Sequence, residues 1–142
     1  MIVYADSSLL ASLYAIDAHS ANARQRMAAT PELLVTPLNR TELAHAFHLQ
    51  VFRRSISVTM ANQAWQQFDD DCRRGLWTRV DLPPTAWNIC ADLALRFSPI
   101  LGVRTLDSLH VACALELKAD RFWTFDDRQA RLAQAVGLDT RP

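Results

Sequence analysis

Residues 2–8 read Ile-Val-Tyr-Ala-Asp-Ser-Ser, and this short stretch contains the pattern on which the rest of the fold depends. The apolar residues 2–5 are sufficient for one short buried strand. Asp6 follows at once, and Asp and Ser are the side chains that most often begin a helix. Leu9 and Leu13 then recur at helical spacing. The stretch therefore predicts a buried strand that ends in an acid and passes directly into a helix.

The same order of residues returns near the other end of the chain, where residues 122–127 read Phe-Trp-Thr-Phe-Asp-Asp. Between the two stretches, short apolar runs alternate with segments of helical periodicity. This alternation predicts an α/β fold, with a parallel sheet that carries helices on its faces. Strands are expected over 2–5, 33–36, 76–82 and 119–125, helices from about residue 8 and over 21–29, 39–54, 58–74, 85–97, 105–118 and 126–136, and a loop over 99–103.

The composition indicates an ordinary globular protein. The chain has 142 residues, of which 50% are hydrophobic, and this length predicts a single domain over residues 1–142 with its own core. Only three Gly are present, and neither a GxGxxG nor a Walker pattern occurs, which excludes the usual dinucleotide and P-loop sites. Fifteen basic residues balance fifteen acidic ones, so any contact with nucleic acid must come from local clusters of arginine.

Several features predict a soluble, cytoplasmic protein. The first six residues lack the basic region of a signal peptide, and no apolar run approaches the length of a membrane span. The three cysteines, Cys72, Cys90 and Cys113, have neither zinc-site nor CxxC spacing. They are expected to be buried thiols in a reducing compartment.

Four acidic residues occupy informative places. Asp6 and Asp126 directly follow the first and last predicted strands, and the carboxyl ends of parallel strands share the edge where open α/β sheets bind ligands. Glu42 and Asp107 lie near the starts of two predicted helices, after loops that could return to that edge. Taken together, the four positions predict a cluster of carboxylates.

Each acid also has a simpler explanation, because acids are common at helix starts. Asn39 to Glu42 resembles a capping box, Thr105 could cap a helix with Asp107 in its first turn, and Asp126 could be an N-cap with Gln129 behind it. For any acid taken alone, capping is the more economical interpretation. A converging set, however, needs protons or a cation to offset its mutual repulsion.

The chemistry of such a cluster favours a hard divalent cation. Carboxylate oxygens, with no cysteine spacing and no assembled set of histidines, indicate Mg²⁺ or Mn²⁺ rather than zinc. Two ions of this kind can orient a water for attack on a phosphodiester bond and stabilise the leaving oxygen. The residues alone therefore suggest phosphodiester hydrolysis.

Four segments resemble, in order and in context, the acidic motifs of PIN-domain ribonucleases, and the chain length is similar to that of VapC-type toxins of type II toxin–antitoxin systems. The segments are residues 3–10 (Val-Tyr-Ala-Asp-Ser-Ser-Leu-Leu), 39–43 (Asn-Arg-Thr-Glu-Leu), 104–112 (Arg-Thr-Leu-Asp-Ser-Leu-His-Val-Ala) and 123–128 (Trp-Thr-Phe-Asp-Asp-Arg). The resemblance spans nearly the whole chain.

The resemblance implies a Rossmann-like α/β/α sandwich with a short central parallel sheet. It also implies a Mg²⁺- or Mn²⁺-dependent endoribonuclease that is inhibited by a small VapB-like antitoxin and commonly forms a homodimer. Asp6, Glu42 and Asp107 match the acids that hold the first metal ion, and Asp126 matches a less regular fourth acid. Its neighbour Asp127 is a competing choice, but Asp126 directly follows Thr-Phe as in the family pattern.

Three further residues are expected to support the site. Ser8 and Thr124 match polar positions that orient the acids or bound water in the family. Arg104 lies three residues before Asp107, where it could contact the substrate phosphate or pair with one of the site acids.

Two alternatives remain open at this point. The first is a catalytically inactive module of the same fold that binds only RNA or an antitoxin. The second is a di-iron oxidase, because Glu42-x-x-His45 and Asp107-x-x-His110 imitate the acid–histidine pairs of di-iron bundles. This second alternative predicts an all-helical fold and leaves the two strands that end in Asp unexplained.

Overall fold

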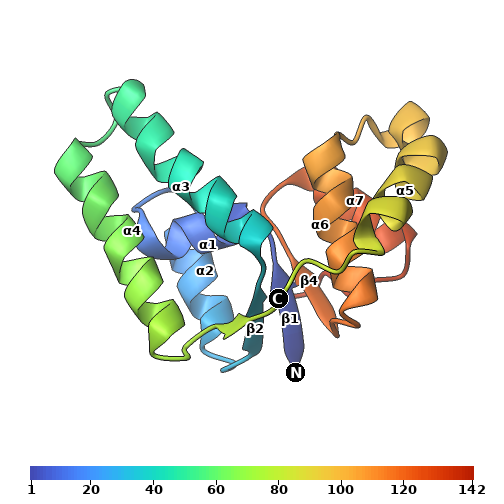
Figure 1. The fold of residues 1–142 in the computed structure, drawn as a ribbon, viewed down its shortest axis with the longest axis horizontal. Coiled ribbons are helices and arrows are strands. Elements are labelled where there is room, and N and C mark those ends of the chain that lie inside the picture. The colour runs from blue at the N-terminus through green and yellow to red at the C-terminus, as the bar shows by residue number, and fades with distance from the viewer.

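The structure, a computed structural model, describes all residues from Met1 to Pro142. Helices are gathered in two groups with a small sheet between them, as Figure 1 shows. The elements, in chain order, are β1 (Ile2–Ala5), α1 (Ser7–Tyr14), α2 (Ser20–Met27), β2 (Glu32–Val35), α3 (Pro37–Phe52), α4 (Val58–Arg73), β3 (Thr78–Arg79), α5 (Ala86–Leu101), α6 (Thr105–Glu116), β4 (Arg121–Trp123) and α7 (Asp127–Ala135).

The sheet has four parallel strands in the order β3-β2-β1-β4. In register, Val3 of β1 is paired with Leu33 of β2 on one side and with Arg121 of β4 on the other. The chain thus builds outward from β1 to β3 and then crosses to the opposite side of β1. The predicted α/β fold with a short central parallel sheet is confirmed.

Both faces of the sheet are covered, so its strands are almost continuously apolar. Val3 and Trp123 point into a core shared with α1 to α4, whereas Tyr4 and Phe122 point into a second core shared with α5 to α7. This alternation follows the two-residue period of a strand. The two core clusters are the reason for the three layers in Figure 1.

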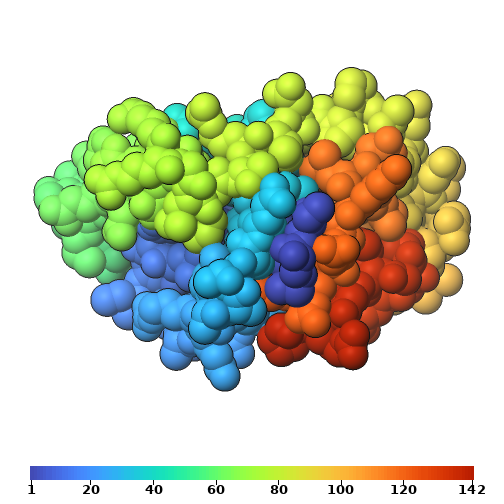
Figure 2. All heavy atoms as spheres, turned by 90° about the horizontal axis from the view of Figure 1, so that it is seen from below, coloured from blue at the N-terminus to red at the C-terminus, as the bar shows by residue number.

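The sheet presents its two edges differently. Figure 2 shows the amino ends of the strands, where the first residues lie between the chain near residue 30 and the chain near residue 120. The carboxyl ends lie at the opposite edge, and α1, α3 and α7 begin there, directly after their strands. That edge therefore receives the residues that follow each strand.

Several boundaries differ from those expected, among them the strand predicted over 119–125, which is shortened to Arg121–Trp123. The strand predicted over 76–82 is reduced to Thr78–Arg79, because β3 lies at the edge of the sheet and pairs only with β2. The loop predicted over 99–103 is wrong in its first three residues, since α5 continues through Pro99 to Leu101 and the loop begins at Gly102. Proline removes one hydrogen bond of the last turn, and the helix ends instead at Gly102, whose φ of 66° suits a residue without Cβ.

No helix in the structure combines the length and the apolar character needed to cross a membrane.

Two phenylalanines of α3 should contribute very differently to stability, because only one of them lies in the first core. Phe47 is fully buried and Phe52 is 84% exposed. Phe47→Ala should lower the free energy of unfolding by about 3–5 kcal/mol, because it removes buried contacts and leaves a cavity. Phe52→Ala is the matched control and should change it by less than about 0.5 kcal/mol. Urea unfolding of both variants measures this, and similar losses would contradict the packing described here.

Candidate active site

The four predicted acids line one cavity of about 460 Å³ at the carboxyl edge of the sheet. Its walls come from the amino-terminal parts of α1, α3, α6 and α7, so both helical layers contribute. Only one of the lining residues is hydrophobic. The lining residues are Asp6, Ser7, Ser8, Glu42, Arg104, Thr105, Leu106, Asp107, Asp126 and Gln129.

Asp6 is the N-cap of α1. Its Oδ1 accepts hydrogen bonds from the Leu9 N–H at 3.2 Å and from the Ser8 hydroxyl at 2.7 Å. The Ser8 hydroxyl in turn accepts the Phe125 N–H at 3.1 Å, and the Asp6 N–H is bonded to the Trp123 carbonyl at 3.0 Å. The end of β4 and the start of α1 are thereby joined at this carboxylate.

Asp126 caps α7 in the same way. Its Oδ1 accepts the N–H groups of Arg128 and Gln129 at 2.8 and 3.1 Å. The buried Thr124 hydroxyl accepts the Asp126 N–H at 2.9 Å and so fixes the turn after β4. Asp127, the competing choice for the fourth acid, is exposed and lies outside the cavity lining.

Asp107 is also part of a helix cap. Its Oδ2 accepts the Arg104 N–H at 2.9 Å, which closes a capping box at the start of α6. The Arg104 side chain adds a longer contact to the same oxygen, 3.3 Å from Nε, while most of that side chain stays exposed. Oδ1 of Asp107 receives only a long hydrogen bond of 3.3 Å from the Gln129 amide.

Glu42 is the one acid that does not cap a helix. The capping box expected over 39–42 is wrong, because α3 begins two residues earlier than predicted and is capped by Thr36 and Asn39. Asn39 is buried and also donates to the Ala5 carbonyl at 2.9 Å, which ties the start of α3 to the end of β1. Glu42 consequently lies in the second turn of α3 and turns toward the cavity.

Two protein donors converge on the same oxygen of Glu42. The Ser7 hydroxyl and His110 Nε2 each lie 2.5 Å from Oε2. Burial alone would raise the pKa of Glu42, but the hydrogen bonds from His110 and Ser7 outweigh burial and hold this pKa below its ordinary value. Glu42 is therefore held in its charged form.

Asp6 shows the opposite tendency. Burial raises its pKa above the ordinary value, and the nearby His110 and the hydrogen bonds to the carboxylate offset this only in part. A buried carboxylate without a counter-charge is costly, so this position favours a cation or a proton.

The four carboxylates share one pattern of hydrogen bonds. Each uses one oxygen to accept two bonds from its own surroundings: Oδ1 in Asp6 and Asp126, Oδ2 in Asp107, and Oε2 in Glu42. The other oxygen is left with a long amide contact in Asp107, and with no hydrogen bond in Glu42 and Asp126. In Asp6 the Thr124 hydroxyl and His110 are further groups nearby. Capping and ligand binding are thus compatible roles of the same side chain.

The donor set fits a hard divalent cation. It is composed of carboxylate oxygens without sulfur, which suits Mg²⁺ or Mn²⁺. Gln129 adds a buried Oε1 that has no hydrogen-bond partner. No three acidic, histidine or cysteine side chains approach closely enough in the structure to hold one ion. Side-chain movement would therefore have to accompany metal binding.

Two lining residues were not singled out from the sequence. Ser7 donates to Glu42 while its neighbour Ser8 donates to Asp6, because successive residues at the start of a helix point about 100° apart. Gln129 reaches Asp107 from α7 across the cavity. The Asp-Ser-Ser sequence could have indicated Ser7, whereas nothing local distinguishes Gln129 from an ordinary helix residue.

The di-iron alternative is wrong. It requires an all-helical fold, whereas the structure has a parallel sheet. His110 bonds Glu42 rather than the acid three residues before it, and His45 bonds the Thr41 carbonyl of its own helix at 2.9 Å.

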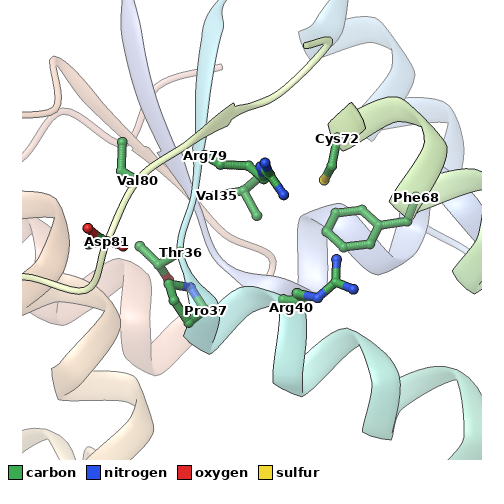
Figure 3. Close-up of a pocket in the computed structure, with 9 residues that line it drawn as sticks. All are labelled: Val35, Thr36, Pro37, Arg40, Phe68, Cys72, Arg79, Val80 and Asp81. Atoms are coloured by element: carbon green, nitrogen blue, oxygen red, sulfur yellow. The ribbon is translucent and has the colours of Figure 1, made fainter. Parts of the chain in front are cut away.

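A second cavity, of about 380 Å³, lies beside the carboxyl ends of β2 and β3. Arg40 and Arg79 reach into it from α3 and β3 (Figure 3). Arg40 is paired with Asp69 at 2.5 Å, and its guanidinium lies 4.8 Å from the centre of the Trp65 ring. None of the four acids lines this cavity, so it is separate from the acidic one.

The raised pKa of Asp6 predicts how the metal-free protein responds to pH. The folded state holds this proton more tightly than the unfolded state does, so stability falls as pH rises through the raised pKa. Asp6→Asn keeps an N-cap but cannot ionise. The free energy of unfolding of the variant minus that of the unchanged protein should therefore be larger at pH 7.5 than at pH 4. Urea unfolding in metal-free buffer measures the difference, and an equal difference at both pH values would contradict a raised pKa.

The comparisons with known proteins concern the fold and the family. No curated protein matches the sequence. The structure is similar to that of the toxin VapC20 from Mycobacterium tuberculosis, which cleaves the sarcin–ricin loop, with a TM-score of 0.69 and 17% identity over 99% of both chains. It is also similar to VapBC2 from Rickettsia felis bound to a promoter DNA fragment, with a TM-score of 0.66 and 13% identity over 99% and 98% of the two chains.

A third similar structure is FitAcB from Neisseria gonorrhoeae, with a TM-score of 0.68 and 11% identity over 100% of this chain and 97% of the other. At these identities, the three structures show a common fold. The family model for the PIN domain matches residues 3–135, a range that includes all four acids and both strands that end in Asp. This chain belongs to the PIN domain family.

Proposed function

We propose that this protein is a metal-dependent endoribonuclease and the toxin of a toxin–antitoxin pair. The observation that carries the proposal is the cavity at the carboxyl edge of the sheet, where four carboxylates each keep one oxygen that is not used by a helix cap or by His110. A structural cap alone gives no reason for four such side chains to meet around one space.

Each acid has a distinct role in this proposal. Asp6, Glu42 and Asp107 would hold the first Mg²⁺ or Mn²⁺, and Asp126 would complete a second, weaker position. When bound, such ions supply Lewis-acid activation of water and neutralise charge at the scissile phosphate. Ser8 and Ser7 keep the carboxylates of Asp6 and Glu42 in fixed orientations through their hydroxyl groups.

Arg104 provides the cation that faces the substrate. Its backbone N–H is engaged by Asp107, while 66% of its side chain remains exposed at the rim of the cavity. A guanidinium in this position can donate to a phosphate oxygen without giving up the cap of α6. Thr124 acts less directly, by fixing the backbone N–H of Asp126.

The proposed partners follow from the structural relatives. VapC20 is a toxin that cleaves the sarcin–ricin loop, and VapBC2 was solved bound to a DNA fragment from its promoter. By this similarity we propose an RNA substrate in the cytoplasm, a small VapB-like antitoxin as inhibitor, and a homodimer as the form in which the toxin acts.

Metal-dependent cleavage is the direct test of this proposal. Purified, antitoxin-free protein should cleave RNA in the presence of Mg²⁺ or Mn²⁺, and the cleavage should stop when EDTA is added. Asp107→Asn should lower the rate by more than about 100-fold, because even residues that only support a metal ligand commonly contribute up to that factor. Cleavage that persists in the variant would contradict the site. RNA binding without cleavage under either metal would instead favour the inactive binding module.

The two adjacent acids after β4 allow a matched comparison. Asp126 lines the cavity, whereas Asp127 is exposed and lies outside the lining. Asp126→Asn should therefore reduce cleavage at limiting Mn²⁺ by at least about tenfold, since the variant keeps the helix cap but loses a charge. Asp127→Asn should cleave like the unchanged protein. A larger loss of cleavage in Asp127→Asn than in Asp126→Asn would instead identify Asp127 as the fourth acid.

A further inference from the structure

Glu42 is held from inside the protein by a chain of two buried side chains. His110 Nε2 lies 2.5 Å from Glu42 Oε2, and His110 Nδ1 lies 3.0 Å from the Tyr4 hydroxyl. His110 is only 1% exposed and Tyr4 has no exposed surface. The chain joins β1, α6 and α3, three elements that are far apart in the sequence.

The direction of these hydrogen bonds follows from what each group can donate. A charged carboxylate only accepts, so the bond to Glu42 requires the proton of the imidazole on Nε2. In a neutral ring Nδ1 is then an acceptor, and the Tyr4 hydroxyl is the donor that it faces. Glu42 therefore sets the tautomer of His110, Tyr4 supports that tautomer by donating to Nδ1, and His110 directs its Nε2–H toward Glu42.

The consequence for Glu42 concerns which of its oxygens is available. His110 and Ser7 both reach Oε2, and no hydrogen bond reaches Oε1. Glu42 lines the acidic cavity, and about a quarter of its side chain is exposed. In the metal-free structure Glu42 is thus held through one oxygen, and its other oxygen is free for a ligand.

We propose that Tyr4 and His110 are positioning residues that present Oε1 of Glu42 to a divalent cation as a single-oxygen ligand. This inference rests on the proposed function, because it requires that Glu42 binds a metal ion. It goes beyond that function in assigning a role to two residues that are buried and outside the cavity lining.

Packing alone does not explain this arrangement. The Tyr4 ring stacks on Phe122 at 5.9 Å with an angle of 6° between the planes, and a phenylalanine would keep that contact. The hydroxyl is the part of Tyr4 that serves His110. Tyr4→Phe therefore removes the hydrogen bond and leaves the ring contact in place.

The chain offers a matched control for this variant. The Tyr14 hydroxyl is also partly buried and hydrogen-bonded, since it donates to Asp71 at 2.8 Å and accepts from Trp77 at 2.6 Å. It lies outside the acidic cavity. Tyr14→Phe thus removes a comparable hydroxyl group without touching the chain of bonds to Glu42.

Mn²⁺ binding, measured by titration calorimetry, tests the proposal without relying on activity. His110→Leu should weaken Mn²⁺ binding by about 10- to 100-fold, the range found for residues that support metal ligands. His110→Gln can still donate to Glu42 and should restore most of the affinity. Added to Glu42→Gln, the His110→Leu change should have no further effect. Binding by His110→Leu equal to that of the unchanged protein would overturn the proposal.

The tyrosine variants decide the question if His110→Leu does not fold. Tyr4→Phe should weaken Mn²⁺ binding several-fold and should cleave normally once Mn²⁺ is raised, whereas Tyr14→Phe should bind like the unchanged protein. Equal binding by both variants would overturn the role of Tyr4.

Nitrogen NMR of the metal-free protein separates this inference from the proposed function. The His110 ring should carry its proton on Nε2, and a proton on Nδ1 would overturn the assigned direction of the bonds. An unchanged protein that shows the expected tautomer but binds no Mn²⁺ would contradict the proposed function and, with it, the role in metal binding.

Discussion

The commitment of one carboxylate oxygen to a helix cap, in three of the four acids of the cavity, is the constraint on which this structure depends. One oxygen of Asp6, Asp107 and Asp126 closes the first turn of a helix, and this fixes where that helix begins relative to the sheet. The same side chains line the cavity that these helices enclose. Moving a carboxylate would therefore disturb a helix start, and moving a helix start would displace a carboxylate. The positions of the acids and the positions of the helices therefore depend on each other.

The helix starts also reduce the electrostatic cost of gathering four acids. The amino end of a helix carries a partial positive charge, and a carboxylate that caps it is stabilised by N–H groups and by the helix dipole. Glu42 lacks this support, and its place is taken by His110 and Ser7, which hold its pKa below the ordinary value. Asp6 is the exception, since burial outweighs its cap and raises its pKa. At Asp6 the cost of burying a charged carboxylate is therefore not fully offset, and a bound cation would relieve it.

Much of this could be predicted from the sequence, for reasons that are visible in particular residues. The apolar runs before Asp6 and Asp126 are local and unambiguous, and they indicate both the parallel sheet and the edge at which the acids gather. Helix starts were less certain. The residues 39–42 indicate a cap at Asn39, but α3 is capped by Thr36, and the difference frees Glu42 from a capping role. Pro99 favours a helix that ends at residue 97, but the last turn tolerates proline and Gly102 ends the helix.

The contacts that complete the site were beyond the reach of sequence patterns. The bonds from His110 to Glu42 and from Gln129 to Asp107 join residues 68 and 22 positions apart, and they arise only when α6 and α7 are packed against the sheet. Sequence patterns also treated capping and ligand binding as competing interpretations, because a pattern does not distinguish the two oxygens of one carboxylate. In the structure each cap uses a single oxygen of its carboxylate, so the two interpretations are compatible.

The measurement that tests this compatibility most directly is a crystal structure of the protein with Mn²⁺, in which the anomalous signal locates the ion. The account predicts Mn²⁺ in the acidic cavity, bound through Asp6 Oδ2, Glu42 Oε1 and Asp107 Oδ1, with the caps of α1 and α6 intact. An ion bound through the capping oxygens with those caps broken, or an ion located outside the cavity, would contradict it.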